Sequence, residues 1–262
     1  MGSSPPGWAT DLAILEHTGS RLEEHEDHLV VRTPDNPDFH WGNFVLVTDG
    51  DAVDDADRWV GVFGAAFPDA GWMSVGLPRM PAAPGRWSAL GLGLELEDVL
   101  STRALPRPTP LAPGYTVRRL EGEDWEQDLA RSVAENDATG AEDRTSFLRF
   151  ARGQLLARQD LSARGLGAWF GAFTPDGALV ADLGIVRCGS TARYQDVTTD
   201  EAHRRQGLAS HLLGVAAQWA ADSGCEQWVI VTGATNPAGR VYRACGFVHD
   251  TGTVQAYRSP AR

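Results

Sequence analysis

The chain has 262 residues, of which 42% are hydrophobic and 22% charged, which is typical of a soluble globular protein with one large domain or two ordinary ones. Its formal net charge is −12, and every basic side chain other than histidine is an arginine because the sequence contains no lysine. An acidic chain without a basic stripe argues against nucleic acid and anionic membranes as partners and favours a cationic or amine ligand.

The first part of the chain alternates helical and extended patterns. Apolar periodicity and turn residues predict helices at 10–27 and 51–67 and strands at 29–33, 39–48, 72–76 and 91–96. Two histidines and two acidic residues at 25–28 could bind a metal on a helix, but a charged, solvated helix end explains them better. We therefore expect no metal site here.

A proline-rich segment follows. Residues 104–114, ALPRPTPLAPG, contain four prolines, which exclude both a helix and a central strand. We interpret 106–114 as an extended linker between a first domain, residues 1–105, and a second domain, residues 115–262.

The second part contains a longer series of elements. The patterns predict strands at 115–120, 168–174, 179–187, 193–199, 227–232, 247–249 and 253–257, and helices at 123–135, 145–158, 208–222 and between Asn236 and Gly246. The strand at 227–232, QWVIVT, is apolar enough to be buried on both faces.

The centre of the second part is the turn RRQGLA, residues 204–209, between a strand and an amphipathic helix. The first N–H groups of that helix have no intrahelical partner and lie at the positive end of its dipole, so they favour a phosphate. Gly207 permits close approach of the backbone, and two arginines add positive charge. A Walker loop is excluded because it needs a lysine, and a dinucleotide fingerprint is excluded because Gly207 stands alone.

Two motifs carry a resemblance to a known family. Arg204, Gly207 and Ala209 fill the pattern (Q/R)-x-x-G-x-(G/A), which resembles the acyl-CoA pyrophosphate loop of the GNAT superfamily of N-acetyltransferases. Downstream, Asn236 and the segment 242–247, YRACGF, resemble the superfamily's N-x-x-A-x-x-x-Y-x-x-x-G-F region, with an offset that places Tyr242 six residues after Asn236. The two matches together are much more specific than either one alone.

The resemblance implies an α/β (mixed α+β) fold with two GNAT-like domains, each a central mixed, mostly antiparallel sheet flanked by helices. The predicted element order over residues 115–258 is the order of that superfamily. Residues 1–105 lack the cofactor pattern, so the resemblance implies a tandem protein whose first half is degenerate and binds no cofactor.

The same resemblance implies acetyl-CoA as co-substrate, no metal, and direct transfer of the acetyl group to a primary amine of a small molecule or peptide. In the resemblance, the loop backbone binds the pyrophosphate and Asn236 binds the cofactor's amide. The preceding strand binds the pantetheine, and an N–H of that strand faces the thioester carbonyl. The implied cofactor-binding residues are Val197, Thr198, Thr199, Arg204, Arg205, Gln206, Gly207, Leu208, Ala209, Ser210, Asn236, Gly239 and Tyr242.

The catalytic groups are less well defined. Tyr242 occupies the family's thiolate-protonating position and is the candidate general acid, although a tyrosine packed on a short helix is the alternative. Asp196 is the nearest acidic side chain and the candidate base, but strand alternation puts it on the opposite face from Gln195 and Val197. A second hypothesis is a non-catalytic acyl-CoA-binding sensor or interaction module.

The sequence also suggests a compartment. No apolar run approaches the roughly 20 residues that span a bilayer, and the start MGSSPP lacks the features of a signal peptide. Cys188, Cys225 and Cys245 are odd in number and lack C-x-x-C spacing, which predicts free thiols. We expect a cytoplasmic protein whose oligomeric state the sequence leaves open, with a homodimer among the alternatives.

Overall fold

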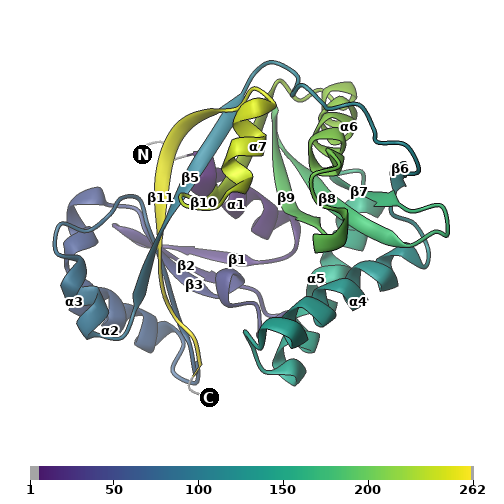
Figure 1. Ribbon diagram of the computed structural model, residues 1–262. Coiled ribbons are helices and arrows are strands. Elements are labelled where there is room, and N and C mark those ends of the chain that lie inside the picture. The colour runs from purple at the N-terminus through teal and green to yellow at the C-terminus, as the bar shows by residue number, and fades with distance from the viewer. Residues whose placement is uncertain (1–5, 261–262) are drawn as a thin grey trace. The chain divides into compact units, whose positions relative to one another are not determined.

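The computed structural model describes residues 6–260, which form two compact units (Figure 1). The first unit contains the residues up to Val99, the segment Val231–Asn236 and the residues from Asp250 onward, and the second contains Leu100–Ile230 and Pro237–His249. The units are therefore interleaved in sequence, unlike the continuous ranges expected, because the last strand pairs with a strand of the first hundred residues. A division of function between 1–105 and 115–262 stays a prediction.

The first unit is a sheet with three α-helices. Its strands lie in the order β1-β2-β3-β4-β11-β5. The strands are β1 (Arg21–Glu24), β2 (His28–Arg32), β3 (Phe44–Val47), β4 (Met73–Leu77), β5 (Gly93–Thr102) and β11 (Val248–Arg258), and the helices are α1 (Pro6–His17), α2 (Ala56–Ala66) and α3 (Pro84–Ala89), with 3-10 turns η1 (His40–Gly42) and η2 (Gly50–Asp54). Trp59 and Phe63, one turn apart on α2, are buried against strand residues such as Val45 and Val75.

Two predictions in this unit are wrong. The helix expected at 10–27 ends at His17, because Gly19 takes a φ of +88° and the next residues pair as β1 with β2. The two strands expected at 247–249 and 253–257 are one strand, β11, which pairs antiparallel with β4 from Val254 to Arg258.

The second unit follows the predicted element order. Its strands lie in the order β10-β9-β8-β7-β6. The elements are β6 (Thr116–Arg119), α4 (Asp124–Thr139), α5 (Arg144–Ala163), β7 (Gly167–Phe173), β8 (Leu179–Cys188), β9 (Thr191–Thr199), η3 (Glu201–His203), α6 (Leu208–Asp222), β10 (Gln227–Gly233) and α7 (Ala238–Ala244). Strands β6 to β9 pair antiparallel, and β9 pairs parallel with β10. The mixed, mostly antiparallel sheet is thus confirmed.

The helices of the second unit cover both faces of its sheet. Along β8, Leu183 and Ile185 are buried in one core with Leu212 of α6, whereas Asp182 bonds to Arg131 of α4. Because successive strand residues point to opposite faces, α6 lies on one face and α4 on the other. The site described below lies on β9, which borders both layers.

The linker is extended, as predicted, but it is anchored to the second unit. Residues 105–112 form neither helix nor strand. The N–H of Arg107 donates to the carbonyl of Cys245 at 2.8 Å, and Pro108 packs against Gly214 in the middle of α6. Farther along, the Tyr115 hydroxyl lies 2.8 Å from Nδ1 of His203, next to the predicted phosphate loop.

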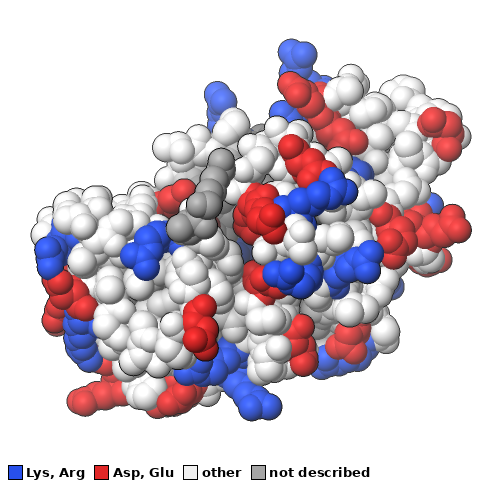
Figure 2. Space-filling view, turned by 90° about the horizontal axis from the view of Figure 1, so that it is seen from below, with Lys and Arg blue, Asp and Glu red and all other residues white. Residues whose placement is uncertain are grey.

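Charge and hydropathy of the described residues add two observations. Basic and acidic side chains are interspersed across the face drawn in Figure 2, which carries no continuous basic stripe. Within residues 6–260, none of the helices combines the length and the apolar character required to cross a membrane.

Two helix-interior glycines test the anchoring of the linker. A Cβ at Gly214 would lie 2.5 Å from Pro108, whereas a Cβ at Gly61 of α2 meets nothing within 4 Å. We expect Gly61→Ala to raise the free energy of unfolding by about 0.5–1 kcal/mol through helix propensity. Gly214→Ala should lower it by about 1 kcal/mol or more through overpacking. Urea denaturation of both variants measures the difference, and equal stabilisation would show that the linker does not pack on α6.

Candidate functional site

The start of α6 presents several backbone N–H groups that have no intrahelical partner. Gly207 is its N-cap residue with a φ of +74°, and Arg205 also takes a positive φ of +63°. The first bond back along the helix runs from the N–H of His211 to the carbonyl of Gly207 at 2.9 Å. Among the described residues no acceptor is recorded for the N–H groups of Leu208, Ala209 and Ser210. These groups suit a phosphate.

The charged residues of the loop lie beside this backbone. The side chains of Arg204, Arg205 and Gln206 are exposed. Nε of Arg204 donates to the carbonyl of Thr199 at 3.2 Å, which ties the loop to the end of β9. The structure therefore brings together the end of the strand and the loop, as the sequence predicted.

Of Ser210, only the backbone N–H contributes to the candidate phosphate site, because its side chain is bonded within the protein. Its Oγ accepts bonds from the N–H of Thr109 at 3.0 Å and from the Thr109 hydroxyl at 2.9 Å, and it lies 3.2 Å from Sγ of Cys245. Nδ1 of His211 lies 3.0 Å from the carbonyl of Thr109. The linker thus forms a wall beside the first turn of α6, which sequence reasoning missed because no local pattern connects residues 101 positions apart.

Strand β9 stops pairing with β10 and forms a bulge before it reaches the loop. Its parallel register with β10 covers Thr191–Arg193 opposite Gln227–Val229. Its register with β8 shifts between Asp182 and Gly184, and there Asp196 takes a φ of +48°. From Tyr194 to Thr199, in the part of the chain that the structure describes, β9 does not pair with β10. An extended ligand can bond to such a strand edge.

Asp196 lies at the bulge. Regular alternation places its side chain opposite to those of Gln195 and Val197. Its carboxylate accepts a bond from Nη2 of Arg158 at 2.8 Å, so it lies on the face covered by α5. Val197 packs against the core that contains Leu212 of α6, so the predicted orientation of Asp196 relative to Val197 agrees with the structure.

The residues of α7 take different environments. Tyr242 is 5% exposed, and burial raises its pKa to about 12, an effect that the nearby positive Arg193 partly opposes. Gly239 is also buried, one turn earlier. Asn236 is exposed, its N–H donates to the carbonyl of Gly233 at 2.8 Å, and the helix begins two residues later with Pro237 at the N-cap position. The residue at the helix cap is therefore Pro237 and not Asn236.

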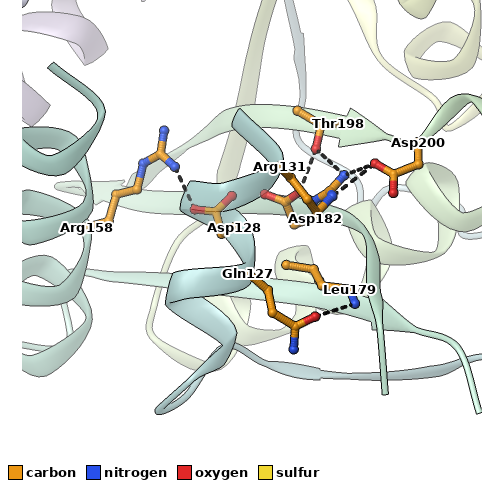
Figure 3. Close-up of polar contacts among 8 residues, drawn as sticks. All are labelled: Gln127, Asp128, Arg131, Arg158, Leu179, Asp182, Thr198 and Asp200. Atoms are coloured by element: carbon orange, nitrogen blue, oxygen red, sulfur yellow. Dashed lines mark hydrogen bonds and ion pairs between the residues drawn. The ribbon is translucent and has the colours of Figure 1, made fainter. Parts of the chain in front are cut away.

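A buried ionic network behind β9 was not predicted (Figure 3). Arg131 of α4 pairs with Asp182 and donates to Asp200 at 2.7 Å, and the Thr198 hydroxyl donates to Asp182 at 2.5 Å. Arg158 of α5 pairs with Asp128 at 3.0 Å. The only sequence signal was the placement of charged residues on the face of α4 that also carries the apolar Trp125 and Leu129.

Asp128 is the most perturbed carboxyl of this network. It is 4% exposed, and burial raises its pKa to about 6, with a further increase from the negative charge of Asp182 and a partial decrease from Arg158. A carboxyl with a raised pKa between acidic neighbours is an arrangement that recurs at functional sites and in structural ion networks.

Comparisons with known proteins give a family match and several similar folds. The model of the acetyltransferase (GNAT) family matches residues 120–247. A search of curated proteins found no match. A solved GCN5-related N-acetyltransferase from Kribbella flavida has a TM-score of 0.68 at 14% identity, covering 99% of this chain and 98% of that chain.

Two other solved structures share the fold. One is a functionally unknown conserved protein from Staphylococcus epidermidis, with a TM-score of 0.66 at 12% identity, covering 93% of this chain and 96% of the other. Another is a tandem GNAT protein from the clavulanic acid biosynthesis pathway, with a TM-score of 0.52 at 15% identity, covering 97% and 94%. The similarity of fold spans both units. Residues 120–247 of the chain form a domain of the acetyltransferase (GNAT) family.

The raised pKa of Asp128 predicts a pH-dependent stability. Because its pKa is about 6 in the folded protein and 3.8 as a model value, the folded state binds this proton more tightly than the unfolded state. The stabilisation is complete below about pH 4 and is lost as the pH rises through about 6, an effect of order 3 kcal/mol. Asp128→Asn should remove this slope.

Urea denaturation between pH 4.5 and 7.5 measures that slope. The exposed Asp160 near the end of α5 provides the control, and Asp160→Asn should keep the wild-type slope. An Asp128→Asn protein with the same slope as the wild type would show that Asp128 does not titrate in this range.

Proposed function

We propose that the chain is an N-acetyltransferase that moves the acetyl group of acetyl-CoA to a primary amine of a small molecule or peptide by direct attack. Membership of the GNAT family supports acetyl transfer in general. The observation that carries the proposal is the first turn of α6, whose N–H groups and two arginines lie at the end of a strand with an unpaired edge.

Each part of the co-substrate has residues of suitable chemistry. The backbone of 205–210 would bind the pyrophosphate, with Arg204 and Arg205 at its rim. The edge of β9 at Val197–Thr199 would bond to the amide-containing arm, and an N–H there would face the thioester carbonyl. Asn236 and Gly239 would contact the cofactor from the second motif. Residues 1–105 would bind no acetyl-CoA.

Tyr242 is proposed as the general acid that protonates the departing thiolate. The role of Asp196 as base stays a prediction, and its ion pair weakens that role because the carboxylate already accepts a bond from Arg158. We also propose that the protein works in the cytoplasm and needs no metal.

A sensor that binds acyl-CoA without turnover is the second candidate. The observation in its favour is the ion pair of Asp196, which leaves the nearest carboxylate of β9 engaged by Arg158. The two candidates share the cofactor site and differ only in turnover.

A charge reversal at the start of α6 tests cofactor binding. Ala209 is the second residue of this helix, where an added Asp stabilises the helix dipole but repels a pyrophosphate. Acetyl-CoA at about 100 times its Kd should stabilise the wild type by about 2.7 kcal/mol, and Ala209→Asp should lose this stabilisation. Thermal denaturation with and without acetyl-CoA measures it.

The matched control is Thr145→Asp, the same charge at the second residue of α5. It should leave the acetyl-CoA effect unchanged. If Ala209→Asp retains the full stabilisation, the pyrophosphate binds elsewhere.

Tyr242→Phe separates the enzyme from the sensor, since it removes one hydroxyl and leaves the ring to pack. If Tyr242 is the acid, turnover should fall by about two orders of magnitude while acetyl-CoA affinity stays within a few-fold. Release of free CoA thiol with an accepted amine measures turnover, and isothermal titration measures affinity. Full activity of the phenylalanine variant at neutral pH would exclude Tyr242 as the proton donor, and a sensor would show no turnover in either protein.

A further inference from the structure

The bulge in β9 depends on an uncommon backbone conformation. Asp196 is not glycine, yet it has a φ of +48°, which disfavours residues that carry a Cβ. Aspartate tolerates this region better than most residues, but the conformation persists only where its surroundings hold it. The question is what holds Asp196 there.

Arg158 is the side chain that meets it. Its Nη2 donates to Oδ2 of Asp196 at 2.8 Å, while its Nη1 donates to Oδ2 of Asp128 at 3.0 Å. The Arg158 side chain is 17% exposed and that of Asp128 6%, whereas the Asp196 side chain is 51% exposed. The guanidinium is thus fixed by a buried carboxylate at one end and holds the more exposed carboxylate with the other.

This arrangement connects two helices to the strand edge. Asp128 comes from α4, Arg158 from α5 and Asp196 from the bulge of β9. A planar guanidinium presents several donors in a fixed geometry, so it can bridge two carboxylates at set positions, whereas a lysine ammonium is a single point charge on a flexible stem. The position of the Asp196 carboxylate therefore follows from the packing of α4 and α5.

We propose that Arg158 is a positioning residue for acetyl transfer: by holding the Asp196 carboxylate it maintains the β9 bulge and so aims the N–H groups after the bulge, beginning at Val197, at the thioester carbonyl. This inference rests on the proposed function. In it, the carboxylate of Asp196 serves to shape the backbone rather than to accept a proton. A hydrogen-bond donor that is misaimed loses its stabilisation of the developing oxyanion.

The experiment is a mutant cycle between the two residues. Arg158→Met retains much of the apolar stem and removes the charge, and Asp196→Gly removes the carboxylate but accepts a positive φ without strain. We expect Arg158→Met to reduce kcat by about 100-fold with acetyl-CoA Kd unchanged within a few-fold. The double variant should have the same kcat as Asp196→Gly and a higher kcat than Arg158→Met, because glycine keeps the bulge without Arg158.

Arg158→Lys covers the case in which Arg158→Met fails to fold. It keeps the positive charge beside Asp128 but cannot bridge both carboxylates. It should therefore also lower kcat while it leaves the Kd for acetyl-CoA unchanged within a few-fold. A loss of activity in Asp196→Gly as large as that in Arg158→Met would overturn the inference and identify the carboxylate itself as the working group. Unchanged kcat in both Arg158 variants would also overturn it.

A crystal structure of an Arg158 variant tests the bulge independently of turnover. Loss of the positive φ at residue 196 supports the inference, and persistence of the bulge at its wild-type geometry overturns it. Absence of transfer by the wild type to any amine would count against the proposed function, whereas the crystallographic result would still decide whether Arg158 holds the bulge.

Discussion

Two half-buried arginines between the helices and the sheet constrain the second unit through paired charges. Removing a guanidinium from water is costly unless its charge is paired and its donors are satisfied. Arg131 is satisfied by Asp182 and Asp200, and Arg158 by Asp128 and Asp196. These bonds depend on direction, so they fix the rotation and translation of α4 and α5 relative to β8 and β9 in a way that apolar packing alone does not.

The same network has more acid than base. Four carboxylates share two guanidinium groups, and the pKa of Asp128 is raised first by burial and then by the negative charge of Asp182. Because Asp196 is the most exposed of the carboxylates bonded to Arg158, the excess negative charge reaches the surface at the bulge of β9. A cationic amine that approaches this edge would meet a favourable field, in agreement with the acidic composition of the chain.

Local features of the second unit were predictable from the sequence, and non-local ones were not. The element order, the loop at Gly207 and the amphipathic helix after it depend on residues within one turn or one strand, so periodicity and turn chemistry identify them. The interleaving of the units depends on the pairing of β11 with β4, which lie about 180 residues apart and share no local signal. The helix expected to continue past His17 failed because its charged end pairs as a strand, an outcome decided by tertiary context.

The site residues divide in the same way. The prediction that the loop from Arg204 lies between a strand and a helix agrees with the structure, although the 3-10 turn η3 separates the loop from the end of β9. Alternation placed Asp196 and Val197 on opposite faces, as the structure does, but the bulge and the bond to Arg158 depend on the neighbouring strand and on α5, which no local pattern indicates. The wall formed by Thr109 was missed because a proline-rich segment indicates only what it cannot form.

The environment of Tyr242 limits how it could act as an acid. A proton transfer from a phenol with a pKa of about 12 to a thiolate whose conjugate acid has a pKa of roughly 8.5 is uphill by about 5 kcal/mol. Burial, however, raises the pKa of a thiol for the same reason that it raises that of the phenol, since both lose the hydration of their anions. The transfer is therefore feasible only if the thiolate departs into the same apolar surroundings that bury Tyr242. An enzyme with this acid must exclude water from the leaving sulfur, a requirement that a sensor would not have.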